Sequence, residues 1–158
     1  MSKKKLDKYP NYKLVFDYVY GVVEGRINVN KAQVKGCKRF LRMLEDDRYD
    51  FDPRPCEKII GIIEKTFVHR QGENVDGVPM RGSPFLLQDF HKYIIYAIMG
   101  FYFKGTNKRV VRESLIHVPR KNVKTTFAAA LAWALSLYYR KSGSKCYIAS
   151  AALKQSLE

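Results

Sequence analysis

Lys124 and Thr125 form a pair of side chains that suits phosphate chemistry. They follow a Pro119-Arg120-Lys121-Asn122 turn and open a long Ala- and Leu-rich segment that predicts a helix. The N-terminus of a helix presents unpaired backbone N–H groups and the positive end of the helix dipole, and both stabilise phosphate groups. In such a loop a lysine reaches the β- and γ-phosphates of a nucleotide, and a threonine hydroxyl binds Mg²⁺. The candidate nucleotide-binding residues here are Arg120, Lys121, Asn122, Lys124 and Thr125.

Two positions depart from the usual phosphate-loop pattern, G-x-x-x-x-G-K-[ST]. Val118 and Val123 stand where that pattern has glycines. A β-branched side chain restricts the backbone and fills space that a phosphate group must approach. A helix N-terminus that carries Lys and Arg without binding phosphate explains the same local composition, so both interpretations stay open.

The segments before and after the loop add further motifs to the phosphate-loop pattern. An aromatic segment, PFLLQDFHKYIIYAIMGFYF, begins at Pro84, and KRVVRESLIHVPRKNVKTTFAAALAWAL and KCYIASAALKQS follow it. This order resembles the N-terminal part of the ATPase domain of the large terminase subunit of tailed double-stranded DNA phages. In that family an aromatic segment near the adenine pocket precedes a strand and a P-R-K-N-G-K-[ST] loop. The matching positions are Phe85, Leu87 and Phe90 in the aromatic segment, Pro119 to Thr125 in the loop, and Gln155 in the last motif.

The resemblance covers nearly the whole chain and implies a nucleotide site, with ATP and Mg²⁺ as cofactors. It implies that Phe85, Phe90 and His91 lie near the adenine, although Phe90-His91 stands where the family usually has Trp-Gln. Lys124 would contact phosphate, and Thr125 would bind Mg²⁺ through the nucleotide. The complete protein of this family packages double-stranded DNA into procapsids, cleaves that DNA with a C-terminal nuclease, and works with the small terminase subunit and the portal protein.

Several residues of such a motor have no counterpart in this sequence. No apolar run ending in Asp-Glu follows the loop, and the chain ends at Glu158 before any acidic nuclease cluster. We therefore expect no catalytic residue here, and neither ATP hydrolysis nor DNA cleavage by this chain alone. The alternative hypothesis is a non-catalytic basic module that binds DNA or a protein partner. Salt-sensitive DNA binding that nucleotide does not affect would favour this alternative.

The composition is strongly basic. The formal net charge is +14, from 29 Lys and Arg against 15 Asp and Glu, and residues 101–158 carry eleven basic and two acidic residues. This balance suits polyphosphate, a nucleic-acid backbone or a solvated basic surface. Three cysteines without C-x-x-C spacing and three dispersed histidines give no reason to expect a structural metal. No apolar run reaches the ~18 residues of a membrane span, and no signal peptide is visible, so we expect no membrane partner and a location in the host cytoplasm.

Hydrophobic periodicity and capping signals predict five helices. They run from Pro10 to about Glu24, from a cap at Asn28 or Asn30 to about Asp46, from Asp52-Pro53 to about Phe67, from about Leu87 to Phe101, and from about Thr125 to Arg140. The glycine-rich residues from Arg70 to Pro84 predict a connecting loop.

Two strands complete the expected architecture. Val110 to Val118 and Cys146 to Ala149 would pair in parallel around the last helix, in a right-handed βαβ unit. The predicted fold class is therefore α/β, with an N-terminal helical segment leading into the first βαβ unit of a P-loop NTPase fold. We expect residues 1–84 to form a helical region with a linker loop, and residues 85–158 to start the ATPase domain. Unpaired edges of that sheet would favour self-association.

Overall fold

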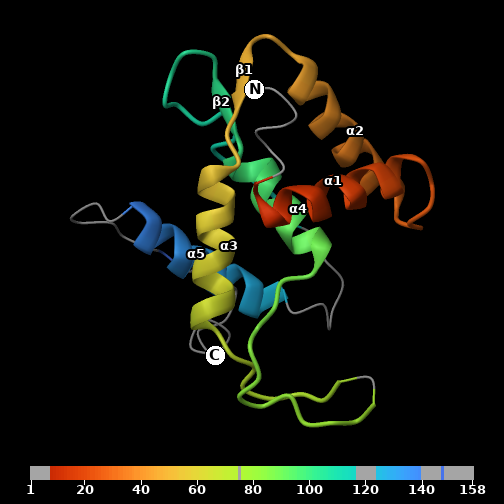
Figure 1. Ribbon diagram of the computed structural model, residues 1–158, viewed down its shortest axis with the longest axis vertical. Helices are drawn as coiled ribbons and strands as arrows, with labels where there is room; N and C mark the ends of the chain where they lie inside the picture. The colour runs from red at the N-terminus through yellow and green to blue at the C-terminus, as the bar shows by residue number, and fades with distance from the viewer. Residues whose placement is uncertain (1–7, 75, 117–123, 140–146, 148–158) are drawn as a thin grey trace.

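The computed structural model describes residues 8–74, 76–116, 124–139 and 147. Within these residues the protein is mostly helical, with one small two-stranded antiparallel sheet (Figure 1). The elements in chain order are α1 (Pro10–Val23), α2 (Lys31–Glu45), β1 (Tyr49–Phe51), α3 (Arg54–Thr66), α4 (Asp89–Met99), β2 (Phe101–Phe103) and α5 (Lys124–Tyr139).

The helices begin where the sequence places a starting signal. Proline occupies the first position of α1, where its missing N–H costs nothing. Before α2, Asn30 is the cap, because its Oδ1 accepts a hydrogen bond from the Gln33 N–H at 2.9 Å. Before α3, Asp52 Oδ1 accepts a hydrogen bond from the Arg54 N–H at 3.0 Å. The predicted starts of these three helices are therefore confirmed to within two residues.

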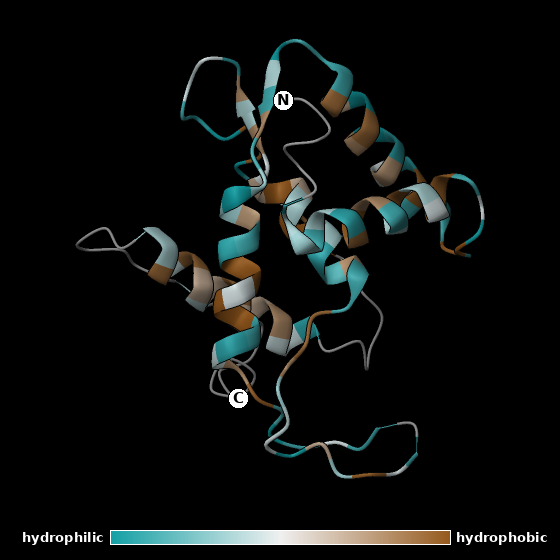
Figure 2. Ribbon diagram, in the orientation of Figure 1, coloured by the Kyte–Doolittle hydropathy of each residue, from teal (hydrophilic) through white to brown (hydrophobic). Residues whose placement is uncertain are grey.

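The core lies where α1, α3 and α4 meet. α4 packs against α1 and α3, while α2 covers α1 and α5 covers the other side of α3. Hydrophobic and hydrophilic residues alternate along α2 and α3 (Figure 2), as expected for helices with one buried face. The fully buried side chains include Val15 and Val19 of α1, Ile59 and Ile63 of α3, and Ile95 and Met99 of α4.

Glu57 joins three helices through one carboxylate. Its Oε1 accepts hydrogen bonds from the Asn11 backbone N–H at 3.0 Å and from the Tyr96 hydroxyl at 2.6 Å, and its Oε2 accepts one from Asn11 Nδ2 at 2.7 Å. An acidic group removed from water needs such donors, because an unpaired one is costly. The α1, α3 and α4 helices are therefore tied at one point by polar contacts as well as by apolar packing.

The small sheet brings together two distant parts of the chain. β1 pairs antiparallel with β2, with Tyr49 opposite Phe103 and Phe51 opposite Phe101. The Phe51 and Phe101 rings lie 5.1 Å apart between centroids, and both contact Phe40 of α2. Periodicity could not identify either strand, because three residues are too few to establish a period of two.

The parallel strand expected from Val110 to Val118 differs from the structure. Residues 111–116 carry no strand pairing; only an isolated bridge between Tyr102 and Arg109 and a hydrogen bond from the Val110 N–H to Phe101 O are present nearby. A strand exists only where a neighbouring strand pairs with it. The neighbour we expected, Cys146 to Ala149, lies outside the described residues except for Tyr147, as do residues 117 and 118.

The connection between α3 and α4 is the long loop that the glycines predict. It projects from the end of α3 as an extended excursion (Figure 1). Isolated bridges join Val68 to Pro84 and Glu73 to Pro79, and Gly77 and Gly82 adopt positive φ angles of 76° and 85°. None of the helices in the described part of the chain combines the length and apolar character that a bilayer crossing requires.

Candidate functional site

Lys124 and Thr125 are the first two residues of α5, and both side chains are exposed to solvent. The predicted start of this helix is thus confirmed to within one residue. The first N–H groups of a helix have no partner within it, so this end of α5 can offer donors beside the Lys124 ammonium and the Thr125 hydroxyl. The other predicted loop residues, Arg120, Lys121 and Asn122, lie outside the described residues together with Val123.

The aromatic segment at the start of α4 lies against the first turn of α5. The His91 and Phe127 rings are 4.6 Å apart between centroids with their planes inclined by 34°, and the Phe90 ring lies 3.8 Å from that of His91. Phe127 is buried and follows Thr125 by two positions. The contact between the His91 and Phe127 rings therefore places the start of α4 beside the first turn of α5, two positions after Thr125. That Phe90, His91, Lys124 and Thr125 share a nucleotide site stays a prediction.

His91 is a polar side chain held away from water. Only 4% of it is exposed, and this burial lowers its pKa from 6.5 to about 4, so the imidazole is neutral near pH 7. A neutral imidazole has one donor and one acceptor nitrogen. Among the described residues, Nδ1 of His91 has no hydrogen-bond partner. Within the described part of the chain, one hydrogen-bonding position of this ring is therefore unsatisfied.

Phe85 was also expected near the adenine, but its side chain is not accessible to solvent. Its side chain is 2% exposed, and its ring packs edge-on against His69 with 5.2 Å between centroids. Phe85 thus anchors the end of the long loop to the core.

Sequence reasoning missed a partly buried ion pair that orients the start of α4. Lys92 Nζ lies 3.5 Å from Glu64 Oε1, and the same oxygen accepts a hydrogen bond from the Leu87 N–H at 3.0 Å. Lys92 is only 9% exposed, so its charge needs this partner. The contact fixes the first turn of α4, which carries His91, against α3. The available signal was a lysine inside an otherwise apolar helical run.

No cluster of three His, Cys, Asp or Glu side chains suitable for a metal occurs within the part of the chain that the structure describes. Cys37 and Cys56 are buried free thiols, and burial raises the pKa of each. The Thr125 hydroxyl is the metal candidate that the sequence provides. A single neutral ligand of this kind suits a metal ion carried mainly by the phosphates of a nucleotide.

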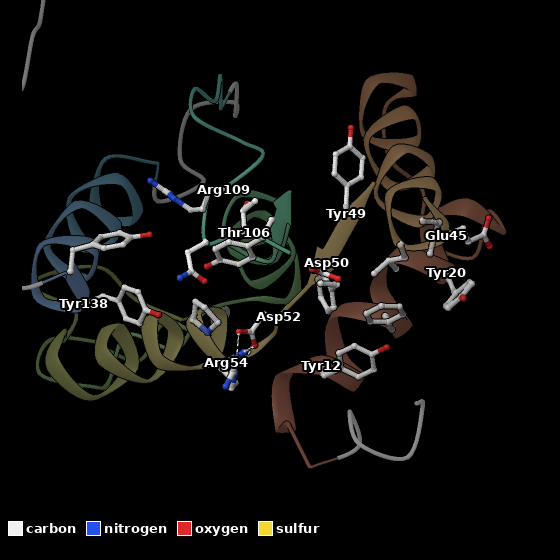
Figure 3. Close-up of a pocket in the computed structure, with 18 residues that line it drawn as sticks. Tyr12, Tyr20, Glu45, Tyr49, Asp50, Asp52, Arg54, Thr106, Arg109 and Tyr138 are labelled. Carbon is white, nitrogen blue, oxygen red and sulfur yellow. Dashed lines mark hydrogen bonds and ion pairs between the residues drawn. The ribbon is translucent and has the colours of Figure 1, made fainter. Parts of the chain in front are cut away.

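A second feature, a tyrosine-lined cleft of about 950 Å³, was not expected from the sequence. It lies between α1, β1, α3 and the C-terminal end of α5, with Tyr138 and Arg109 on one side and Tyr20 and Glu45 on the other (Figure 3). Arg54 on its floor is paired with Asp52 at 2.7 Å. The stretch of α5 from Lys124 to Tyr138, ~20 Å, separates this cleft from the start of the helix, so the cleft is not part of the predicted nucleotide site.

Comparisons with models of protein families, with curated proteins and with solved structures found no match to this chain. Function is therefore inferred from the chemistry and placement of its own residues.

Proposed function

We propose that this chain is the N-terminal part of the ATPase domain of a large terminase subunit, and that it binds ATP at the N-terminus of α5. The observation that carries the proposal is the contact of His91 with Phe127, at 4.6 Å between ring centroids. This contact joins the segment assigned to adenine with the helix assigned to phosphate. The two segments are more than 30 residues apart in sequence. Lys124 and Thr125 follow from the loop pattern, whereas Phe90 and His91 are assigned to the adenine by the resemblance alone.

The exposed end of α5 fits the phosphate groups of ATP. Lys124 supplies a positive charge at the start of α5. A helix N-terminus adds its dipole and backbone N–H donors. Thr125 supplies a hydroxyl oxygen for Mg²⁺. When bound, ATP with Mg²⁺ would supply the phosphoryl bond whose hydrolysis drives DNA packaging in this family.

The start of α4 fits the base. Phe90 is half-buried and presents an aromatic ring, and His91 is neutral with Nδ1 unpaired among the described residues. His91 is 4% exposed with its Nδ1 closed off from solvent, so its part is to support Phe90, whose half-buried ring is the surface against which the base would lie.

The proposal also includes the fold and the partners that the resemblance to the family implies. The expected fold is that of a P-loop NTPase, whose first parallel strands would involve residues beyond those described. The expected partners are double-stranded DNA, the small terminase subunit and the portal protein.

Calorimetric titration with a non-hydrolysable ATP analogue and Mg²⁺ tests the nucleotide site. We expect binding by the parent chain and a loss of about 10- to 100-fold in Lys124→Ala, because a hydrogen bond to a charged group contributes ~1.5–3 kcal/mol. Val123→Gly should bind more tightly, because it removes a branched side chain beside the phosphates. Lys108→Ala, which removes an exposed lysine from the turn after β2, is the matched control and should bind like the parent.

Two results would contradict the nucleotide site. One is equal affinity of the parent and Lys124→Ala, and the other is no binding by either the parent or Val123→Gly. The second result would favour the alternative, a basic module that binds a macromolecule without nucleotide.

A further inference from the structure

Four basic side chains form a continuous stripe on the solvent side of α2. Lys31, Lys35, Lys38 and Arg42 are all exposed, and their spacing of four, three and four residues places them on one face of the helix. We call these four residues the α2 basic face; the exposed Arg39 lies beside it. The face extends for ~16 Å along the helix axis. The opposite side of α2 carries the buried Cys37 and Phe40.

The charges of the α2 basic face are not balanced within the described residues. The ion pairs found there involve Arg26, Arg48, Arg54, Lys92 and Lys104, and none includes a residue of α2. The first turn of α2 has no acidic residue, and the only acidic residue within the helix is Glu45 at its end. Other exposed cations of the described surface, such as Lys13, Lys58 and Lys108, also have no ion pair, but they do not form a row of four on one helix face.

This arrangement works against the stability of the helix itself. Lys31 with Lys35 and Lys38 with Arg42 are like charges four residues apart, and such pairs destabilise a helix. A positive charge in the first turn, as at Lys31, also opposes the helix dipole. A polyanion placed along the face would remove both penalties at once.

We propose that the α2 basic face binds the sugar–phosphate backbone of double-stranded DNA. Proteins that bind single strands combine basic grooves with exposed aromatic rings on which bases stack. α2 offers no such ring, because its one aromatic residue, Phe40, is 2% exposed. A straight row of cations without a stacking surface contacts phosphates and leaves the bases paired, and it binds without regard to sequence.

This inference deepens the proposed function and rests on it for the role of the DNA, whereas the binding itself does not require nucleotide. α2 and α5 lie on opposite sides of the molecule (Figure 1). The two binding sites can therefore be altered and measured separately.

The test is the fluorescence anisotropy of a labelled DNA duplex of arbitrary sequence, titrated with the protein at several NaCl concentrations. The first variant carries Lys31→Gln, Lys35→Gln, Lys38→Gln and Arg42→Gln. The control carries Lys13→Gln, Lys58→Gln, Lys65→Gln and Lys108→Gln, which removes four exposed charges from α1, α3 and the turn after β2. Both variants lose the same net charge, so any long-range attraction falls equally. Glutamine forms helix about as well as lysine, so α2 should remain folded.

We expect the α2 variant to lose most of the salt dependence of binding. Each phosphate contact contributes ~0.9 to the slope of log K against log salt, so the slope should fall by about 3 to 4. Its affinity at low salt should fall at least 10-fold further than that of the control. Its thermal unfolding midpoint should equal or exceed that of the parent, because repulsion within α2 is removed.

Equal losses of DNA affinity in the two variants would overturn the inference, as would binding of a single strand as tightly as the duplex by the parent. Titration of the same variants with the ATP analogue separates this result from the proposed function. An α2 variant that loses DNA and keeps nucleotide supports the α2 basic face. If no protein binds the nucleotide while the α2 variant alone loses DNA, the proposed ATP site fails and the α2 basic face stands.

Discussion

His91 shows how a single buried residue can couple stability to pH. Its folded pKa is about 4 because of burial, whereas in the unfolded chain it returns to its ordinary value near 6.5. Between these pH values the unfolded state binds a proton that the folded state does not. The contribution of His91 to stability is therefore fully present above pH 6.5 and is lost as the pH falls toward 4.

The expected loss at this residue can be measured. Between pH 7.5 and pH 4 the free energy of unfolding should fall by on the order of 3 kcal/mol from His91 alone, since one pKa unit corresponds to ~1.4 kcal/mol. Urea unfolding of the parent and of His91→Gln across this range isolates the effect, because glutamine does not titrate and all other groups are shared. The difference in stability between the two proteins should shift in favour of His91→Gln at low pH. A difference that is constant with pH would show that His91 titrates normally.

At the scale of the elements, two glycines with opposite surroundings test how the helices pack. Gly61 lies inside α3, and a Cβ added there would have no atom within 4 Å. A Cβ added to Gly100, at the end of α4, would lie 2.6 Å from Phe51 Cε2 and 2.7 Å from Tyr96 O. Gly61→Ala should raise the free energy of unfolding by about 0.5–1 kcal/mol, because alanine favours helix. Gly100→Ala should lower it by about 1–3 kcal/mol, because the sheet must move away from α4.

Urea unfolding of both variants beside the parent checks these signs. Gly61→Ala also serves as the control for the general effect of replacing glycine with alanine. If both substitutions stabilised the protein, β1 would not lie as closely against the end of α4 as the structure places it.

The same elements show what the sequence could and could not predict. Helix starts depend on neighbouring residues, so Pro10, Asn30 and Asp52 identified them correctly. β1 and β2 are created by pairing between residues about 50 positions apart, and no local pattern signals that pairing. For the same reason the strand expected from Val110 is not found at residues 111–116. Its β-branched residues favour an extended backbone, but they do not determine whether a second strand lies beside it.

The candidate site also has parts that the sequence could predict and parts that it could not. The position of Lys124 and Thr125 at the start of a helix follows from local composition. The contact between His91 and Phe127 does not, because it depends on how α4 lies against α5. The tyrosine-lined cleft collects residues from six helices and strands, so no local pattern in the sequence could predict it. The α2 basic face was visible in the sequence, but only the structure shows that its charges lack partners among the described residues.

At the scale of the whole molecule, the expected division at residue 84 crosses a single cluster of buried side chains. Val19 and Ile59, from the first region, and Ile95 and Phe127, from the second, belong to the same core. α4 contributes the Tyr96 hydroxyl that contacts Glu57, which ties α1 to α3. The division of the chain at residue 84 stays a prediction. The core that the two regions share allows an experiment on whether residues 1–84 fold by themselves.

We expect residues 1–84 alone to lack a cooperative unfolding transition. Without α4, the buried faces of α1 and α3 lose the helix that packs against both, and Glu57 loses one of its donors. A longer piece, residues 1–116, keeps α4 and β2 and is the matched control. It should unfold in one transition at a lower urea midpoint than the full chain, because the removal of α5 uncovers one side of α3. Circular dichroism during urea unfolding of all three chains distinguishes the outcomes. A sharp transition for residues 1–84 at the midpoint of residues 1–116 would mean that the first three helices form a domain by themselves and that α4 is added to a core already complete.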